Sequence, residues 1–112
     1  MEAKEKVELI RSALDDRKAL DLNVLDVSGR TQMTDYMVVC SGTSNIHIRA
    51  LADRVIEVMK AHGFKGARME GYAEARWVLM DYGDVVLHIF DPEDRDFYRL
   101  EEFWTGREAV AA

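Results

Sequence analysis

The spacing of apolar residues alternates along the chain between a helical period of about 3.6 and a strand period of two, and these changes predict eight elements. Val7, Ile10 and Leu14 lie on one stripe of a helix near the N-terminus. The run over 36–40 is almost wholly apolar, as in an interior strand covered on both faces. The predicted elements are a helix over 3–19, strands over 22–27 and 36–40, a helix over 45–62, strands over 67–69, 76–80 and 85–90, and a helix over 92–104.

Local signals mark where several of these elements begin and end. Ser44 or Asn45 is the expected N-cap of the second helix, because a side-chain oxygen there can accept a hydrogen bond from a backbone N–H that lacks a partner within the helix. We expect the buried stripe of this helix to reach His62 and Gly63 to end it. Gly83 supplies the positive φ that a tight turn between the last two strands requires.

The order α-β-β-α-β-β-β-α, without an internal repeat or a linker, indicates one α/β domain over residues 1–112. We expect a mixed sheet of about five strands with flanking helices. With 112 residues, of which 48% are hydrophobic, the chain is long enough and apolar enough to bury a core.

The hairpin over 76–90 has two faces of different character, because side chains alternate along each strand. A two-residue turn pairs 77 with 88 and 79 with 86, or slips this pairing by two residues without exchanging the faces. One face is wholly apolar and is the predicted core face; it carries Val78, Met80, Val85, Leu87 and Ile89. The other face mixes aromatic, aliphatic and acidic side chains; it carries Trp77, Leu79, Asp81, Asp84, Val86, His88 and Phe90.

The mixed face has two interpretations at this point. If helices cover it, Trp77 is an ordinary core residue, while Asp81 and His88 need buried partners, whose absence would cost several kcal/mol. If it faces water, its aromatic and aliphatic side chains form an apolar patch of the kind that usually binds a partner. A three-residue turn would regroup the two faces.

The charge balance and the N-terminus narrow the class of protein. The chain has 15 basic and 21 acidic residues and a formal charge of −6, which argues against a protein that coats nucleic acid, because Lys and Arg bind phosphate. The acidic stretch over 91–108 is either a solvated helix face or a rim that steers a basic partner. The N-terminus lacks an apolar signal core, and no apolar run is long enough for a membrane span. We therefore expect a cytoplasmic protein that binds neither a membrane nor a specific nucleic-acid sequence.

Candidate catalytic and metal-binding residues are sparse. His47, His62 and His88 are far apart and show no metal-ligand spacing, so we predict no metal, no catalytic residue and no cofactor. Cys40 is the single cysteine and cannot form an internal disulfide. It is expected to be a buried, inert thiol; a redox module is the alternative, because the thiol precedes a predicted helix N-terminus.

The turn Gly42-Thr43-Ser44 between a strand and a helix supports an enzymatic alternative. Its backbone N–H groups could contact a phosphate, although the lysine of a Walker loop is absent. Nucleotidyltransferases begin their active site at a similar turn but need nearby carboxylates for metal-assisted phosphoryl transfer. Asp94 and Asp96 have the D-x-D spacing that is usual for these carboxylates. However, they lie on a predicted helix, where side chains two residues apart diverge. A nucleotide-binding or nucleotidyltransferase-type enzyme that uses this turn is therefore the alternative function.

Several short blocks occur in a fixed order along about residues 5–105. They are L-D-V at 25–27, T-D-Y at 34–36, G-T-S-N at 42–45, E-G at 70–71, R-W-V-L-M-D-Y-G-D at 76–84 and R-D-F-Y-R-L-E at 95–101 with a tryptophan at 104. No block is specific alone, but the ordered set resembles the ribosomal silencing factor family, the Iojap-related proteins. Met33 and Met37 depart from the family's pattern, and neither lies in the hairpin.

This resemblance implies a fold similar to the nucleotidyltransferase superfamily without its catalytic carboxylates, and a binding role without catalysis. Members of the family dock on large-subunit ribosomal protein fourteen, on the face of the large ribosomal subunit that meets the small subunit. A domain placed there blocks subunit joining, so translation falls when nutrients are scarce. Relatives in organelles are linked to assembly of the large subunit.

The mixed face of the hairpin is the expected contact surface for such a partner. Aromatic side chains would supply buried area, and a carboxylate would meet a lysine or arginine of the basic ribosomal protein. A homodimer is a further alternative, because an apolar sheet face can pair with itself. The predicted partner-binding residues are Trp77, Leu79, Asp81, Tyr82, His88 and Phe90, of which the residue in the turn, Tyr82, has the weakest support.

Overall fold

The computed structural model describes residues 2–29, 34–64 and 67–92, and in these ranges two helices and five strands follow one another along the chain. The elements are α1 (Glu2–Asp16), β1 (Leu20–Asp26), β2 (Tyr36–Ser41), α2 (Asn45–Ala61), β3 (Arg68–Glu70), β4 (Trp77–Asp81) and β5 (Val85–Phe90). The predicted last helix lies outside the described residues, apart from its first position.

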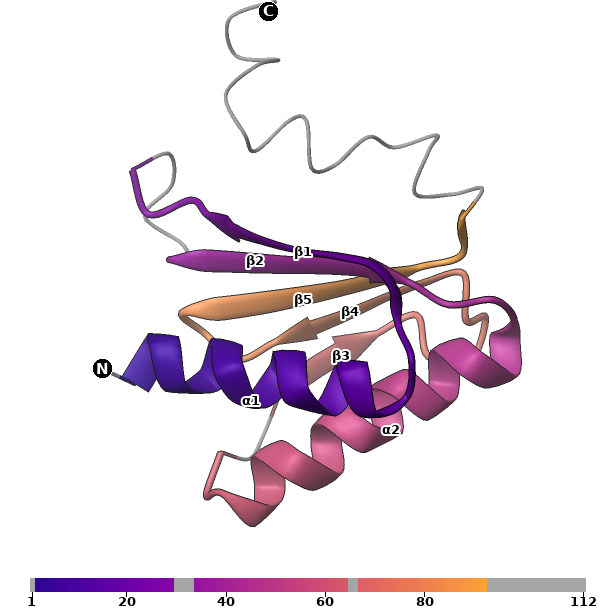
Figure 1. Cartoon of the computed structure of the whole chain (residues 1–112), viewed down its shortest axis with the longest axis horizontal. Helices are drawn as coiled ribbons and strands as arrows, with labels where there is room; N and C mark the ends of the chain where they lie inside the picture. The colour runs from indigo at the N-terminus through magenta and orange to yellow at the C-terminus, as the bar shows by residue number, and fades with distance from the viewer. Residues whose placement is uncertain (1, 30–33, 65–66, 93–112) are drawn as a thin grey trace, which may run out of the picture.

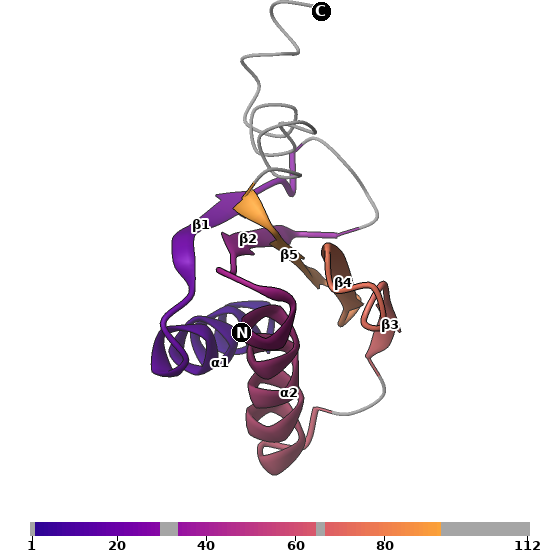
Figure 2. The same ribbon diagram turned by 90° about the vertical axis from the view of Figure 1, so that its right-hand side faces the viewer.

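The five strands form one mixed sheet in the order β1-β2-β5-β4-β3. Only β2 and β5 run parallel among the described strands, and the other neighbours are antiparallel. Both helices lie on the same side of the sheet (Figures 1 and 2). The predicted α/β domain with a mixed five-stranded sheet is thereby confirmed, and the two faces of the sheet have different surroundings.

The main core fills the space between the sheet and the two helices. The predicted stripe of α1 is buried there, and Ile10 and Leu14 have no accessible surface. The stripe of α2 is buried from Ile48 to Met59, but His62 lies one residue beyond the helix and is exposed, so its predicted place on the stripe is wrong. Burying each large aliphatic side chain stabilises the fold by roughly 1.5–3 kcal/mol, so these stripes hold the helices to the sheet.

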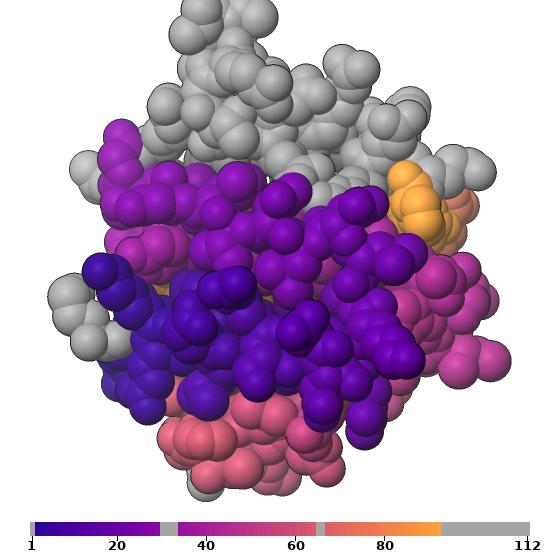
Figure 3. Space-filling model, in the orientation of Figure 1, coloured from indigo at the N-terminus to yellow at the C-terminus, as the bar shows by residue number. Residues whose placement is uncertain are grey.

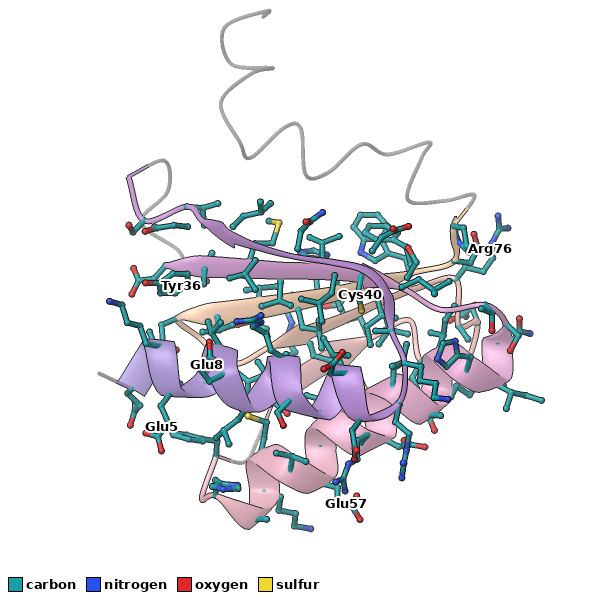
Figure 4. All side chains as sticks on the ribbon, viewed as in Figure 1. Glu5, Glu8, Tyr36, Cys40, Glu57 and Arg76 are labelled. Atoms are coloured by element: carbon teal, nitrogen blue, oxygen red, sulfur yellow. The ribbon has the colours of Figure 1, made fainter. Side chains whose placement is uncertain are left out.

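A second, smaller cluster lies on the opposite side of the sheet. It consists of Val27, Met37, Val39 and Phe90, with two partly buried neighbours, Leu25 and Trp77. The strand β2 is therefore buried on both faces, as its unbroken apolar run predicts. Val38 belongs to the main core, as does Cys40, which Figure 4 labels, and Met37 and Val39 belong to the second cluster.

The hairpin of β4 and β5 has the slipped register of the two that the sequence allows. Trp77 pairs with Phe90 and Leu79 with His88, so the pairing of 77 with 88 is wrong by two residues. The backbone N–H of Tyr82 donates to the carbonyl of Val85 at 2.9 Å, which leaves a two-residue loop of Gly83 and Asp84. Gly83 has φ +90° at the first loop position, where a type II′ hairpin turn takes glycine. Because the slip is even, the faces stay as predicted.

Candidate docking surface

The structure brings most of the predicted contact residues to the sheet face that looks away from α1 and α2. Side chains alternate along β4 and β5, and the intervening residues Val78, Met80, Leu87 and Ile89 pack in the main core. The predicted contact residues on the opposite face are therefore Trp77, Leu79 and Asp81 on β4 and His88 and Phe90 on β5.

These residues differ in how much of each is accessible. Trp77, Leu79 and Asp81 are partly exposed and form a row along β4. His88 is only 5% exposed, and Phe90 is fully buried in the second cluster. The face is therefore neither wholly covered nor wholly open: its β4 side carries the accessible residues, and Phe90 contributes area to the interior.

Among the described residues, Phe90 and His88 hold Trp77 in place through ring contacts and a hydrogen bond. Its ring stacks on Phe90 with centroids 5.0 Å apart and an angle of 28° between the planes. Its Nε1–H donates to Nδ1 of His88 at 2.9 Å, and the two ring centroids are 5.9 Å apart. His88 also stacks on Phe90, with centroids 6.1 Å apart. Aromatic contacts of this kind contribute about 0.5–1.5 kcal/mol beyond burial, so the three rings form one ordered cluster.

Burial fixes the protonation state of His88. Desolvation lowers the pKa of His88 from 6.5 to about 4, so its imidazole is neutral near pH 7. Because the indole N–H can only donate, Nδ1 of His88 must be the unprotonated nitrogen and Nε2 must carry the proton. The Trp77–His88 hydrogen bond therefore requires this one tautomer.

The lowered pKa of His88 predicts a loss of stability in mild acid. His88 binds a proton near pH 6.5 in the unfolded chain but only near pH 4 in the folded chain. The stability that follows from this difference is fully present above pH 6.5 and is lost as the pH falls toward 4. The loss amounts to about 3 kcal/mol over this range. Urea unfolding at pH 7 and pH 4 should show that the parent loses this much more stability than His88→Leu; equal losses in the two proteins would contradict the assignment.

Tyr82 lies apart from the other predicted contact residues. It packs against the main core on the helix side of the sheet, and burial raises the pKa of its hydroxyl to about 12. Asp84, which alternation assigns to the mixed face, instead accepts a hydrogen bond from Nζ of Lys6 on α1 at 2.9 Å. Tyr82 thus lies on the side that alternation from Met80 gives it, whereas Asp84, in the turn, departs from alternation.

The charge on the mixed face of the sheet comes from β4 and the short edge strand β3. Oδ1 of Asp81 accepts a hydrogen bond from the backbone N–H of Gly83 at 2.8 Å, and the side chain stays partly exposed. Arg68, which pairs with Asp81 in the strand register, forms its ion pair with Glu70 at 2.9 Å. The accessible row of β4 thus ends in a carboxylate, beside a charge pair that is balanced within itself.

Two residues outside the predicted contact set position the start of β4. Gly71 has φ +84°, and a Cβ atom there would lie 2.1 Å from the backbone oxygen of Trp77. Arg49 on α2 donates to the carbonyls of Tyr72, at 3.2 Å, and Ala73, at 2.6 Å. These contacts attach the connection between β3 and β4 to α2 and so fix the position of Trp77 at the start of β4. In the sequence, the only indication of this arrangement is the glycine of the E-G block at 70–71.

The turn before α2 uses its polar groups internally. Ser44 is the N-cap, as predicted, and its Oγ accepts from the backbone N–H of His47 at 3.1 Å. The N–H of Gly42 donates to the carbonyl of Phe90 at 3.0 Å, and that of Thr43 to Nδ1 of His47 at 2.8 Å. Nε2 of the same imidazole lies 2.7 Å from the carbonyl of Arg17. Several N–H groups that could hold a phosphate are therefore already bonded.

The described residues line two hollows on the helix side of the sheet. One of about 550 Å³ lies between α1 and β1, the two elements that Figure 3 shows side by side. The other, of about 360 Å³, lies between α2 and the strands β3 and β4 and is lined by Ile56, Lys60, Phe64, Ala67, Met69, Met80 and Tyr82. Neither hollow is lined by a residue of the mixed face of the hairpin. In the described ranges no three His, Cys, Asp or Glu side chains are grouped as a metal would need, and no helix has the length and hydropathy for crossing a membrane.

Comparison with known proteins identifies the family. The family model described as ribosomal silencing factor during starvation matches residues 1–111. The ribosomal silencing factor RsfS of Bacillus subtilis is 38% identical over 104 residues, which are 93% of this chain and 88% of that protein. A mouse protein named for mitochondrial assembly of the ribosomal large subunit is 32% identical over 94% of this chain and 47% of its own length.

Solved structures agree with these matches. A crystal structure of a Chromobacterium violaceum protein superposes with a TM-score of 0.90 and 39% identity, covering 93% of this chain and 87% of that one. A Bacillus halodurans crystal structure gives a TM-score of 0.82 and 38% identity over 90% of this chain and 94% of the other. The chain belongs to the ribosomal silencing factor family.

Proposed function

We propose that this protein binds the large ribosomal subunit at large-subunit ribosomal protein fourteen and sterically blocks joining of the small subunit, which represses translation in the cytoplasm. Membership of the ribosomal silencing factor family supports a ribosomal partner. The name of the mouse relative, which refers to assembly of the ribosomal large subunit, supports the choice of subunit.

The observation that carries this proposal is the partly exposed row of Trp77, Leu79 and Asp81 on β4. An aromatic residue with apolar and charged neighbours is the usual composition of an interface hot spot. The Asp81 carboxylate lies at one end of the row, where it can meet a lysine or arginine of a basic ribosomal protein. Phe90 supports this surface from inside by stacking on Trp77.

The mechanism needs no catalysis, because an occupied site on the large subunit is enough to exclude the small subunit. A nucleotide-handling enzyme would depend on the turn at Gly42 and Thr43. The backbone N–H groups of these two residues already donate hydrogen bonds to Phe90 and His47. Calorimetry with nucleoside triphosphates and magnesium checks this directly. Measurable heat at micromolar protein would favour the enzyme over the steric mechanism.

Sedimentation tests the proposal as a whole. Purified large subunits are incubated with the protein and centrifuged, and small subunits are then added. We expect the protein to sediment with large subunits at a ratio near one and to reduce the yield of joined ribosomes. Undiminished joining at stoichiometric protein would contradict the proposal. Light scattering of the free protein shows whether two copies of the chain associate.

Neutralising Asp81 is expected to slow association. Asn in its place keeps the side-chain oxygen that accepts from Gly83 and removes only the charge. We expect Asp81→Asn to lower the association rate with large subunits roughly two- to fivefold at low ionic strength, because charges at an interface rim act mainly on this rate. The difference should disappear near 1 M salt, where the Debye length is about 3 Å. Stopped-flow or surface-based kinetics measure both rates.

A matched neutralisation on α1 provides the control for this experiment. Glu5 is exposed and points away from the sheet (Figure 4), so Glu5→Gln changes the net charge equally at a distant place. We expect this variant to associate at nearly the parental rate. Equal slowing by both variants would mean that overall charge, rather than a contact at Asp81, controls the encounter.

A further inference from the structure

The hydrogen bond between the two rings of the docking face assigns a separate role to His88. His88 lies opposite Leu79 in the strand register, and Phe90 lies opposite Trp77. The indole of Trp77 reaches diagonally across the hairpin, so that its Nε1 lies 2.9 Å from Nδ1 of His88. The stacked ring of Phe90 touches both of the other rings. Phe90 and His88 therefore both contact the indole, and His88 adds a directional hydrogen bond.

The exposed fractions of the two partners separate their functions. Trp77 is partly exposed, whereas His88 is only 5% exposed and can offer little area to a docked protein. Removing the imidazole would take away the hydrogen bond that orients the indole about its side-chain bonds, while Phe90 would still stack on the ring and its accessible area would remain. A partner would then have to order the indole on binding, and an immobilised side chain carries an entropic cost of that kind.

We propose that His88 is a positioning residue of the docking surface, which holds the indole of Trp77 in its binding orientation through the Nε1–Nδ1 hydrogen bond and does not itself contact the ribosome. This proposal rests on the proposed docking function, since it explains how one residue of that surface is prepared before the partner arrives. It also narrows the partner's side of the interface: the partner presents a pocket that accepts an indole ring of fixed orientation.

Two substitutions at this position separate the hydrogen bond from the packing. His88→Leu fills a similar volume but has no acceptor, whereas His88→Asn places a carbonyl oxygen near the position of Nδ1. We expect His88→Leu to weaken binding to large subunits roughly three- to tenfold, with most of the change in the dissociation rate. We expect His88→Asn to recover most of the parental affinity. Binding is measured with the full chain, after circular dichroism has shown that each variant is folded.

A spectroscopic measurement reports on the indole without any ribosome. The chain has two tryptophans, and a Trp104→Phe variant assigns the two indole N–H signals in a nitrogen–proton NMR spectrum. The Trp77 signal should exchange slowly with solvent in the parent and in His88→Asn, and quickly in His88→Leu. A role of His88 in packing alone would leave this exchange unchanged.

The outcomes distinguish this proposal from the docking function itself. If the parent sediments with large subunits and His88→Leu binds as tightly, the positioning role is wrong and docking stands. The positioning role is equally wrong if the Trp77 signal exchanges at the same rate in all three proteins. If the parent does not sediment with large subunits, docking fails, and the role of His88 in docking fails with it.

Discussion

Replacing Trp77 with alanine is expected to raise the Kd for the large ribosomal subunit about 30-fold or more, which corresponds to about 2 kcal/mol or more. The indole is the largest partly exposed side chain on the row of β4, and it is ordered by Phe90 and His88 before binding. A preordered aromatic side chain loses little entropy on docking, so its buried area contributes almost fully to affinity. Equilibrium sedimentation of the purified variant with large subunits measures the change.

A substitution on the other side of the sheet controls for general effects on the hairpin. Tyr82→Leu removes an aromatic ring but keeps apolar packing against the main core, where Tyr82 lies. We expect its affinity for large subunits to stay within about twofold of the parent, since it lies on the helix side. Thermal unfolding shows that both variants are folded at the temperature of the experiment. A folded Trp77→Ala protein that binds as tightly as the parent would place the docking surface elsewhere.

Local patterns sufficed for the fold and for the two faces of the hairpin. The alternation along β4 and β5 assigned Val78 and Met80 to the core whichever even register the hairpin adopted, because a slip by two residues returns each side chain to its own face. The helical stripe of α1 and the cap at Ser44 are likewise properties of a few neighbouring residues. Such features depend on the backbone close by, which is why the sequence was enough to predict them.

The accessibility of individual residues on the mixed face depended on contacts that are distant in sequence. Phe90 is buried because Met37 and Val39, on a strand some fifty residues earlier, share its cluster, and no local period pairs these segments. The side of the sheet on which Tyr82 lies, in contrast, agrees with the local alternation. Continuing the alternation from Met80 already places residue 82 on the core side, but a turn residue need not follow the strands it joins. Asp84, bonded to Lys6, shows how such a residue departs from alternation.

Gly71→Ala is expected to cause the largest loss of stability among single glycine substitutions in the described chain. The added methyl group would lie 2.1 Å from the backbone oxygen of Trp77, and the backbone at 71 has φ +84°. Backbone cannot move aside as a flexible side chain can, so the β3–β4 connection must shift at a cost of about 3 kcal/mol or more. Urea unfolding measures the loss, and the fluorescence of Trp77, recorded in chains that also carry Trp104→Phe, reports whether the start of β4 has moved.

Gly63→Ala separates strain from the clash. Gly63 has nearly the same φ, +87°, but nothing lies within 4 Å of the Cβ that alanine would add. Its loss should therefore be about 1 kcal/mol, the cost of the left-handed backbone alone. The difference between the two variants measures how tightly the chain at 71 is pressed against Trp77. Because that contact fixes where the indole emerges, Gly71→Ala should also weaken docking under conditions where it is folded, while Gly63→Ala should bind like the parent. Equal losses in stability and binding would show that the Gly71 contact has no part in presenting Trp77.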